Sequence, residues 1–244
     1  MKRIIYFSLC ALILFLPSQA LAAKKVPILI YHSIDEFTGH GSEDLYVHPK
    51  NFEEQMTYLR DHGYTLLTFE RWQEINNVKK PIFITFDDGY KNNLNAFAIF
   101  KKLAGENFKP TGTIFVISDF VGRSNRLSVS DLKMMSDSGF FSIQSHTATH
   151  PDLTKINNYE DELKKAKDKI QQMTGKPVIA LAYPYGKYNR KVIAETKKYY
   201  KYGLTTDPGA FSEKGNEDEL FTLPRTYITY TTTIEQFAKI VNGE

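Results

Sequence analysis

Two adjacent carboxylates follow directly after a short apolar run in this chain. The run Pro81-Ile82-Phe83-Ile84 leads into Thr85-Phe86-Asp87-Asp88-Gly89. An ionised carboxylate is rarely buried unless it is paired or binds a metal, so this pair indicates a site rather than a core. In α/β proteins such sites gather at the C-terminal ends of the strands. The position of Asp87 and Asp88 therefore indicates catalysis or metal binding.

A pair of histidines further along the chain supplies suitable partners. In His146-Thr147-Ala148-Thr149-His150 the imidazoles are four positions apart, and on a helical turn this spacing points both the same way. The alternative is one capping and one surface histidine. Two histidines and a carboxylate make a hydrolytic metal site with positions open for water and substrate. Either Asp87 or Asp88 can supply that carboxylate, and the other is then placed as general base beside a metal-bound water.

The beginning of the chain predicts its compartment. Lys2 and Arg3 precede the apolar stretch Ile4–Leu16, and Ala20-Leu21-Ala22 follows as a cleavage signal. This pattern predicts a signal peptide at residues 1–22 and a secreted or extracytoplasmic chain over residues 23–244. The alternative is an uncleaved anchor, but the apolar stretch is shorter than the roughly 20 residues of a bilayer span.

Composition restricts the chemistry and the partners further. Cys10 lies inside the signal, so the mature chain must hold any metal with histidine and carboxylate. Removing Lys2 and Arg3 takes two positive charges from the formal net charge of +3 and leaves +1, which gives no basis for nucleic-acid binding. An aromatic content of 14% suits a sugar-binding groove, although a core rich in aromatics would give the same value.

Short apolar runs alternate with amphipathic segments along the mature chain. The predicted strands are Val26–Ile34, Pro81–Asp87, Gly112–Ile117, Phe140–Ser145, Val178–Tyr183, Tyr200–Thr205 and Leu223–Ile228. The predicted helices are Lys50–Asp61, Leu94–Leu103, Val129–Ser138, Tyr159–Met173, Asn189–Tyr199 and Thr233–Val241. This order favours a mainly parallel sheet. Seven such units, with no linker between them, predict a single-domain α/β protein with an irregular (β/α)7 barrel.

Together these residues resemble a known family. Thr85–Gly89, His146–His150 and Tyr183-Pro184-Tyr185-Gly186 are similar, in order and spacing, to the first three motifs of the polysaccharide deacetylases (NodB homology, carbohydrate esterase family 4). The resemblance extends from about Val26 to Ile228. It implies removal of N-acetyl groups from amino sugars.

The resemblance also implies a role for each matching residue. Asp87 would be the catalytic base, and Asp88, His146 and His150 would hold a divalent metal. That metal is zinc by ligand type, although cobalt, nickel, manganese or iron would also suit nitrogen and oxygen ligands. Pro184, Tyr185 and Gly186 would bind substrate, with the Tyr185 backbone N–H at the oxyanion.

Two departures from the family pattern suggest replacements. Many members carry an arginine two residues before the motif proline, where this chain has Ala182, and that arginine usually braces the catalytic aspartate. Arg225 could approach Asp87 from the last strand instead, or it could form a surface salt bridge.

The second departure concerns the general acid. Many members have a late histidine, which is missing here, and His32 at the end of the first predicted strand is the best replacement. A structural role for His32, bonding a loop backbone, is the alternative.

We therefore predict a secreted, metal-dependent deacetylase of N-acetylglucosamine-containing polysaccharide, either exopolysaccharide or cell-wall glycan. The start Ile-Tyr-His-Ser at residues 30–33 is similar to the branch that contains the poly-N-acetylglucosamine deacetylases. A catalytically weak carbohydrate-binding module of the same fold is one alternative, and an acetyl-xylan-type esterase is another. The sequence carries no signal for a particular oligomeric state.

Overall fold

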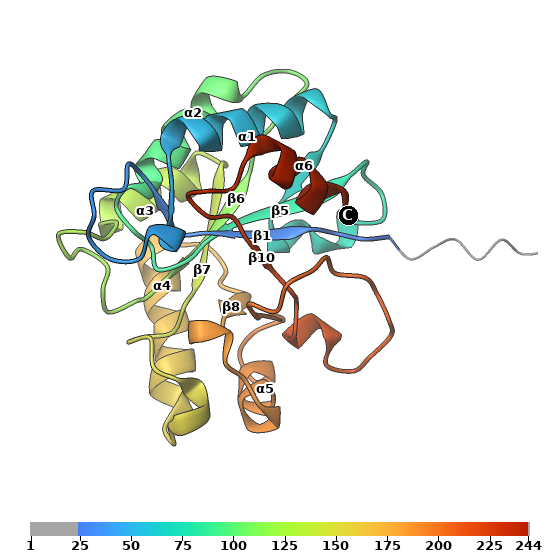
Figure 1. Cartoon of the computed structure of the whole chain (residues 1–244). Coiled ribbons are helices and arrows are strands. Elements are labelled where there is room, and N and C mark those ends of the chain that lie inside the picture. Colours follow the sequence, from blue (N-terminus) through green and yellow to red (C-terminus); the bar gives the residue numbers. More distant parts are fainter. Residues whose placement is uncertain (1–23, 244) are drawn as a thin grey trace, which may run out of the picture.

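Parallel strands form one sheet at the centre of the protein (Figure 1). This computed structural model describes residues 24–243, and the predicted signal peptide lies outside them. The hydrogen-bonded order is β10-β1-β5-β6-β7-β8-β9, and β4 also pairs with β5. The strands are β1 (Ile28–Tyr31), β4 (Thr65–Leu67), β5 (Pro81–Phe86), β6 (Gly112–Val116), β7 (Phe141–Ser145), β8 (Ala180–Ala182), β9 (Tyr202–Leu204) and β10 (Thr226–Tyr227). A separate short pair consists of β2 (Ser33–Ile34) and β3 (Tyr46–Val47).

The sheet closes into a barrel through its last segment. Thr226 pairs with Leu29 in β1, whereas Leu223 forms a parallel bridge with Leu204 in β9. The same short segment therefore joins both edges of the sheet. Pro224 lies between the two pairings and has no N–H to donate, so the segment is not one continuous strand. The predicted irregular (β/α)7 barrel is confirmed.

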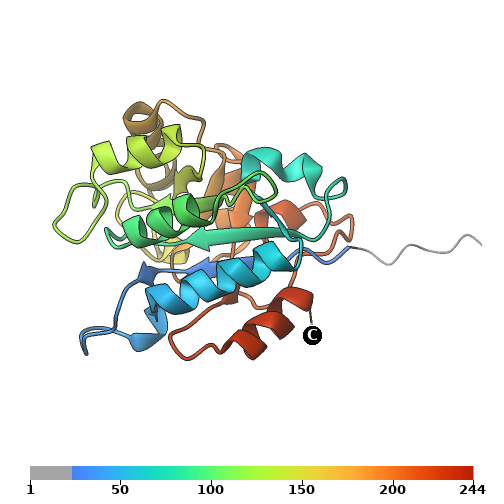
Figure 2. The ribbon, with the colours of Figure 1, turned by 90° about the horizontal axis from the view of Figure 1, so that it is seen from above.

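Within residues 24–243, six α-helices surround the barrel. They are α1 (Pro49–Asp61), α2 (Asn93–Leu103), α3 (Val129–Asp137), α4 (Ala166–Thr174), α5 (Arg190–Lys197) and α6 (Ile234–Asn242). A π-helical segment, Glu160–Lys165, leads directly into α4, and 3-10 helices occupy Glu43–Leu45, Phe69–Glu74, Leu153–Lys155, Pro184–Gly186 and Glu219–Phe221. Figure 2 shows α1 between α2 and α6 on one side of the sheet. None of the helices in the described part of the chain is long and apolar enough to cross a membrane.

Local capping explains where several helices begin and end. Ser128 and Asp131 form a capping box at the start of α3, and Thr233 and Gln236 form another at the start of α6. Each satisfies backbone donors that the first helical turn leaves free. At the C-terminal end of α4, Gly175 adopts a left-handed conformation with φ of 69° and ends the helix at Thr174, one residue beyond the predicted end at Met173.

Side chains of β5 alternate between two apolar clusters. Ile84 and Phe86 pack in the outer cluster beneath the helices, whereas Phe83 belongs to the inner cluster that fills the barrel. Thr85 and Asp87 follow Phe83 at two-residue steps, so they share its inward face. The alternation of the strand thus directs the Asp87 carboxylate into the barrel above an apolar floor.

Three features of the fold differ from the sequence prediction. The short strands β3 and β4 were not predicted, because two or three residues give no readable alternation, and the single strand predicted over Val26–Ile34 is divided into β1 and β2. The helix predicted over Tyr159–Met173 begins as the π-helical segment. The strand predicted over Leu223–Ile228 is regular only at Thr226–Tyr227, because Pro224 has no N–H to continue the pairing.

Gly203 in β9 offers a test of packing on the outer face of the barrel wall. A Cβ there would overlap the Tyr183 hydroxyl and lie 2.9 Å from the backbone oxygen of Phe221. We expect Gly203→Ala to lower the free energy of unfolding by about 1–3 kcal/mol through overpacking, measured by urea denaturation. Gly105→Ala is the control, since a Cβ there meets nothing within 4 Å. Equal stability of the two variants would contradict this account of the barrel wall.

Candidate functional site

Asp87 and Asp88 lie at the C-terminal end of β5, where the chain turns sharply. Asp88 and Gly89 both adopt left-handed conformations, with φ of 71° and 65°. A Cβ on Gly89 would lie 2.9 Å from Cγ1 of Val116, so this turn needs glycine for its size as well as its conformation. The turn brings both carboxylates near one imidazole: Nε2 of His146 lies 3.9 Å from Oδ2 of Asp87 and 3.6 Å from Oδ1 of Asp88.

Arg225 holds the Asp87 carboxylate with two hydrogen bonds. Its Nη1 donates to Oδ1 at 2.7 Å and its Nη2 donates to Oδ2 at 2.8 Å. The guanidinium is itself fixed, because Nε donates to the backbone oxygen of Thr205 at 2.9 Å and Nη1 also donates to Oγ1 of Thr85 at 3.1 Å. Arg225 is 0% and Asp87 2% exposed, so the pair is buried and the alternative of a surface salt bridge is wrong.

This pairing sets the protonation of Asp87. Burial alone would raise the pKa of the carboxyl, but the charge of Arg225, the neighbouring His146 and the hydrogen bonds from Arg225 together lower the pKa to about 2. Asp87 is therefore an oriented, ionised carboxylate at neutral pH.

Asp88, His146 and His150 present three ligand atoms to one point. Nε2 of His146 and Nε2 of His150 are 3.1 Å apart, and they lie 3.6 Å and 3.7 Å from Oδ1 of Asp88. Ligands about 2.0–2.1 Å from a tetrahedral zinc lie roughly 3.3–3.4 Å from one another. The triangle therefore has the size of three corners of such a site, and its donors suit a divalent transition metal.

The two imidazoles are prepared for this contact by their surroundings. Nδ1 of His146 lies 2.8 Å from the backbone oxygen of Ala182, to which it donates, so Nε2 carries the lone pair that faces His150. Burial, followed by the charge of His146, lowers the pKa of His150 to about 4. Without a metal, a neutral His150 with its proton on Nε2 can donate to Nε2 of His146 across this 3.1 Å, and with that proton on Nδ1 instead both Nε2 atoms can bind one cation.

The motif Tyr183–Gly186 forms the next wall of the site. Pro184 is buried, while Tyr185 is 62% exposed and packs its ring edge-on against His150 with centroids 4.6 Å apart. Tyr185 has φ of 59°, and no acceptor for its N–H is found within residues 24–243. Gly186 is also left-handed, and a Cβ there would lie 2.9 Å from the backbone nitrogen of Thr206. The turn thus presents a backbone donor beside His150.

His32 lies at the end of β1 with its ring stacked on Tyr227. The two rings are parallel, with an interplanar angle of 4° and centroids 5.7 Å apart. Burial lowers the pKa of His32, although the charges of Asp87 and Asp88 oppose this shift. The backbone oxygen of His32 accepts a hydrogen bond from Nδ2 of the buried Asn93 at 2.6 Å. His32 therefore lies beside the two carboxylates, and its role as proton donor stays a prediction.

Known proteins are similar to this chain in sequence and in fold. The family model described as Polysaccharide deacetylase matches residues 74–203. The chain belongs to the polysaccharide deacetylase family. As a member, this deacetylase is a hydrolase that acts on the amide bonds of polysaccharide N-acetyl groups.

Three relatives show how far the likeness extends. A polysaccharide deacetylase of Bacillus cereus is 57% identical with a TM-score of 0.89, over 90% of this chain and 69% of that one. The Streptococcus pyogenes deacetylase PplD, solved with acetate, is 29% identical with a TM-score of 0.81, over 90% of this chain and 99% of that one. The poly-β-1,6-N-acetyl-D-glucosamine N-deacetylase of Staphylococcus epidermidis is 27% identical over 74% of this chain and 67% of its own length.

In this deacetylase Arg225 occupies the place left by Ala182. Ala182 points into the inner cluster of the barrel, where its side chain is too short to reach Asp87. The guanidinium of Arg225 comes from the closing segment instead and lies 5.6 Å from the centroid of the Phe115 ring in the same interior. The arginine before β10 therefore holds Asp87, the task for which the side chain of Ala182 in β8 is too short.

Sequence reasoning missed two neighbours of His32 in the deacetylase. Tyr227 covers its ring, and Asn93 binds its backbone oxygen. The cluster Asn92-Asn93-Leu94-Asn95 at the start of α2 was the available signal, because Asn95 also binds the backbone oxygen of Ile34. A pattern of amides before an apolar helix predicts capping more readily than a contact with another strand.

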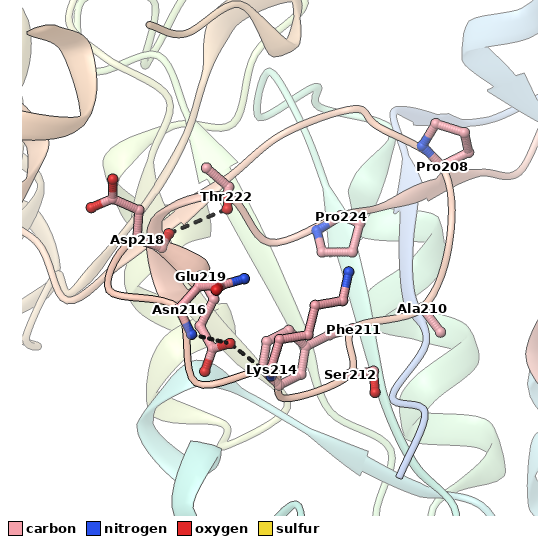
Figure 3. A pocket seen from close by; sticks show the side chains of 10 residues that line it. All are labelled: Pro208, Ala210, Phe211, Ser212, Lys214, Asn216, Asp218, Glu219, Thr222 and Pro224. Carbon is pink, nitrogen blue, oxygen red and sulfur yellow. Dashed lines mark hydrogen bonds between the residues drawn. The ribbon is translucent and has the colours of Figure 1, made fainter. Parts of the chain in front are cut away.

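A separate pocket lies in the loop between Thr206 and Arg225, as Figure 3 shows. It has a volume of about 440 Å³, and Glu219 organises it by accepting from the backbone nitrogens of Lys214 and Asn216. Phe211 on its wall pairs with Val26, just before β1 begins, so this pocket lies toward the N-terminal end of that strand. None of the candidate catalytic or metal residues lines it.

The Arg225–Asp87 pair predicts a pH-dependent loss of stability. In chelator-treated protein, Arg225→Met leaves a buried carboxylate without its cation and should lower the unfolding free energy by about 3–5 kcal/mol at pH 7. Pairing lowers the folded-state pKa of Asp87 from 3.8 to about 2. The contribution of the pair is therefore present above about pH 4 and lost as the pH falls toward 2, so the deficit should shrink in acid.

Urea denaturation at several pH values checks this expectation. The control is the double variant Asp87→Asn/Arg225→Met, which removes both charges and should recover part of the lost stability. A double variant that loses as much as the two single variants combined would show that the residues are not coupled.

Proposed function

We propose that this deacetylase removes acetyl groups from N-acetylglucosamine units of an extracytoplasmic polysaccharide and that it uses a divalent metal, zinc by ligand type. The observation that carries the proposal is the triangle of Asp88, His146 and His150 beside the ionised Asp87. A cation held there would polarise the acetyl carbonyl and acidify a water molecule.

The chain's own residues have distinct tasks in this proposal. Asp87 accepts a proton from the attacking water, and Arg225 keeps its carboxylate oriented and ionised through both Nη atoms. The N–H of Tyr185 donates to the oxygen that becomes negative as the carbonyl is attacked. Pro184 and Gly186 fix the turn that carries this donor. His32, in its protonated form, donates a proton to the departing nitrogen, and the proton that Asp87 accepted is released to solvent afterwards.

Two exposed aromatic rings support a sugar substrate. Among the described residues, Tyr185 and Tyr227 are the aromatic side chains with large exposure, at 62% and 38%. Tyr185 packs against His150 and Tyr227 stacks on His32, so both rings lie at the candidate site. Rings of this kind give an apolar face with a polar tip, which suits the mixed surface of a sugar.

The relatives support the kind of polymer. The Staphylococcus epidermidis relative is named for poly-β-1,6-N-acetylglucosamine, and the Streptococcus pyogenes relative was solved with acetate, the acid that hydrolysis of an N-acetyl group releases. We therefore favour an N-acetylglucosamine polymer over acetylated xylan. Turnover of chitin-type, β-1,6-linked and peptidoglycan oligomers, followed by mass spectrometry, identifies the linkage.

The proposal places the enzyme outside the cytoplasm on sequence grounds alone. Lys2, Arg3 and the apolar stretch that follows them predict export, and Ala20-Leu21-Ala22 predicts cleavage. A polysaccharide of the envelope or matrix would be met in that compartment.

Acetate release tests the proposed reaction directly. We expect turnover of N-acetylglucosamine oligomers to be abolished by a chelator, to return when Zn²⁺ is added, and to be lost in Asp87→Asn. The physical reason is that the amide oxygen of asparagine cannot take the proton. Asp61→Asn, on the exposed end of α1, is the matched control and should retain full activity. Undiminished turnover in Asp87→Asn, or in chelator, contradicts the proposal.

His32→Gln tests the proton donor. We expect kcat to fall by about 10²–10⁴-fold because general acid catalysis contributes that much, while Co²⁺ affinity stays at the wild-type value. His62→Gln is the control, since His62 lies at the end of α1 and stacks on Tyr58. A thermal melt shows whether the contact with Tyr227 is structural. Wild-type kcat in His32→Gln removes His32 from the reaction.

A further inference from the structure

The loop that carries both histidine ligands has a strained backbone. Residues 146–150 form an irregular loop, and the helical turn expected from their spacing is absent. Thr147 and His150 adopt left-handed conformations, with φ of 67° and 65°. A residue other than glycine in this region costs roughly 1–2 kcal/mol, so surrounding contacts must hold the loop in place.

Three of the five backbone N–H groups in this loop bind nearby acceptors. His146 donates to the backbone oxygen of Val116 at 2.8 Å, which continues the pairing of β6 with β7. Thr147 donates to Oγ of Ser145 at 3.2 Å, and His150 donates to Oγ1 of Thr147 at 3.0 Å. These bonds fix the two ends of the loop.

One distant carboxylate satisfies the remaining two. The N–H groups of Ala148 and Thr149 both donate to Oε2 of Glu162, at 3.0 Å and 2.9 Å. The hydroxyl of Thr149 donates to Oε1 of the same residue at 2.6 Å. Glu162 thus accepts three hydrogen bonds from the middle of the ligand loop, and bonds of this kind to a charged acceptor are roughly twice as strong as neutral ones.

The other edge of the loop is held by backbone alone. Ser118 and Asp119 donate their N–H groups to the backbone oxygens of Thr147 and Ala148, at 3.0 Å and 3.1 Å. The loop therefore lies between the end of β6 on one side and Glu162 on the other. Without Glu162, two N–H groups of the strained segment would lose their partner.

The π-helical segment explains how Glu162 reaches the loop. Glu160–Lys165 forms a widened turn before α4, a feature that occurs often at functional sites. Leu163 in the same turn is fully buried in the outer cluster. The burial of Leu163 therefore fixes this segment, and with it the position of Glu162 beside the N–H groups of Ala148 and Thr149.

We propose that Glu162 is a positioning residue for the metal: it holds the loop so that His146 and His150 aim at one point. The proposal rests on the metal site of the proposed function. It requires no contact between Glu162 and the metal, because its three hydrogen bonds all go to residues 148 and 149. Residues that orient ligands in this way typically account for about 10–100-fold in metal affinity.

The test is a Co²⁺ titration of the chelator-treated protein, followed by its visible absorption spectrum. We expect Glu162→Ala to bind Co²⁺ about 10–100-fold more weakly than wild type, with altered absorption bands. Hydrogen exchange of the metal-free protein should be faster in the peptide that contains residues 146–150. Glu162→Gln keeps an oxygen for the two N–H groups, so its affinity should fall between those of Glu162→Ala and wild type.

The matched control is Glu160→Ala, which removes the same charge from an exposed position of the same turn. Equal Co²⁺ affinity and equal exchange in Glu162→Ala and Glu160→Ala would overturn the proposal. If Glu162→Ala does not fold, the Co²⁺ affinities of Glu162→Gln and Thr149→Val test the proposal instead. Wild-type Co²⁺ affinity in both variants would overturn it. Failure of the wild-type protein itself to bind Co²⁺ would overturn the metal site of the proposed function, which is a different result.

Discussion

The buried ion pair between Arg225 and Asp87 connects the closure of the barrel to the candidate site. Its bidentate hydrogen bonds run from the closing segment to the end of β5, and both side chains are almost fully buried. Burying two charges costs more in solvation than a well-packed apolar pair would, so stability alone does not explain them. The pair is explained if the barrel must present an oriented, ionised carboxylate at the C-terminal ends of its strands.

The same pair shows why the barrel is irregular at this place. Leu223 pairs with β9 and Thr226 pairs with β1, and Arg225 lies between them. The side chain of Arg225 points inward, where Ala182 of β8 also belongs to the inner cluster and occupies little of the interior. The segment that closes the sheet therefore also carries the arginine that orients Asp87, and the small side chain of Ala182 leaves space in the same interior. A larger residue at position 182 would have to share the interior with the guanidinium.

Sequence reasoning succeeded where a single periodicity or motif decides the outcome. Apolar runs such as Pro81–Phe86 predicted the long strands, and the two motifs predicted that Asp88 would lie beside His146 and His150. The family resemblance also suggested the approach of Arg225, because the arginine that many members carry two residues before the motif proline is Ala182 in this chain. Sequence reasoning could not find Glu162 or Tyr227, since each meets the site through tertiary packing that leaves no local pattern. The π-helical turn was equally invisible, because its core residues follow the spacing of an ordinary helix.

Electrostatics give the candidate site a preference for a cation before any ligand binds. Burial lowers the pKa of His150 to about 4, so this imidazole is neutral near pH 7. Arg225 pairs with Asp87, which leaves the carboxylate of Asp88 to face the Nε2 atoms of His146 and His150. A histidine must be neutral before it can bind a metal, so His150 would release little proton on binding. The burial that lowers the pKa of His150 therefore also keeps its imidazole in the form that can bind a metal. The strained backbone of residues 146–150 is already present without a metal, so its free-energy cost is part of folding and not of metal binding.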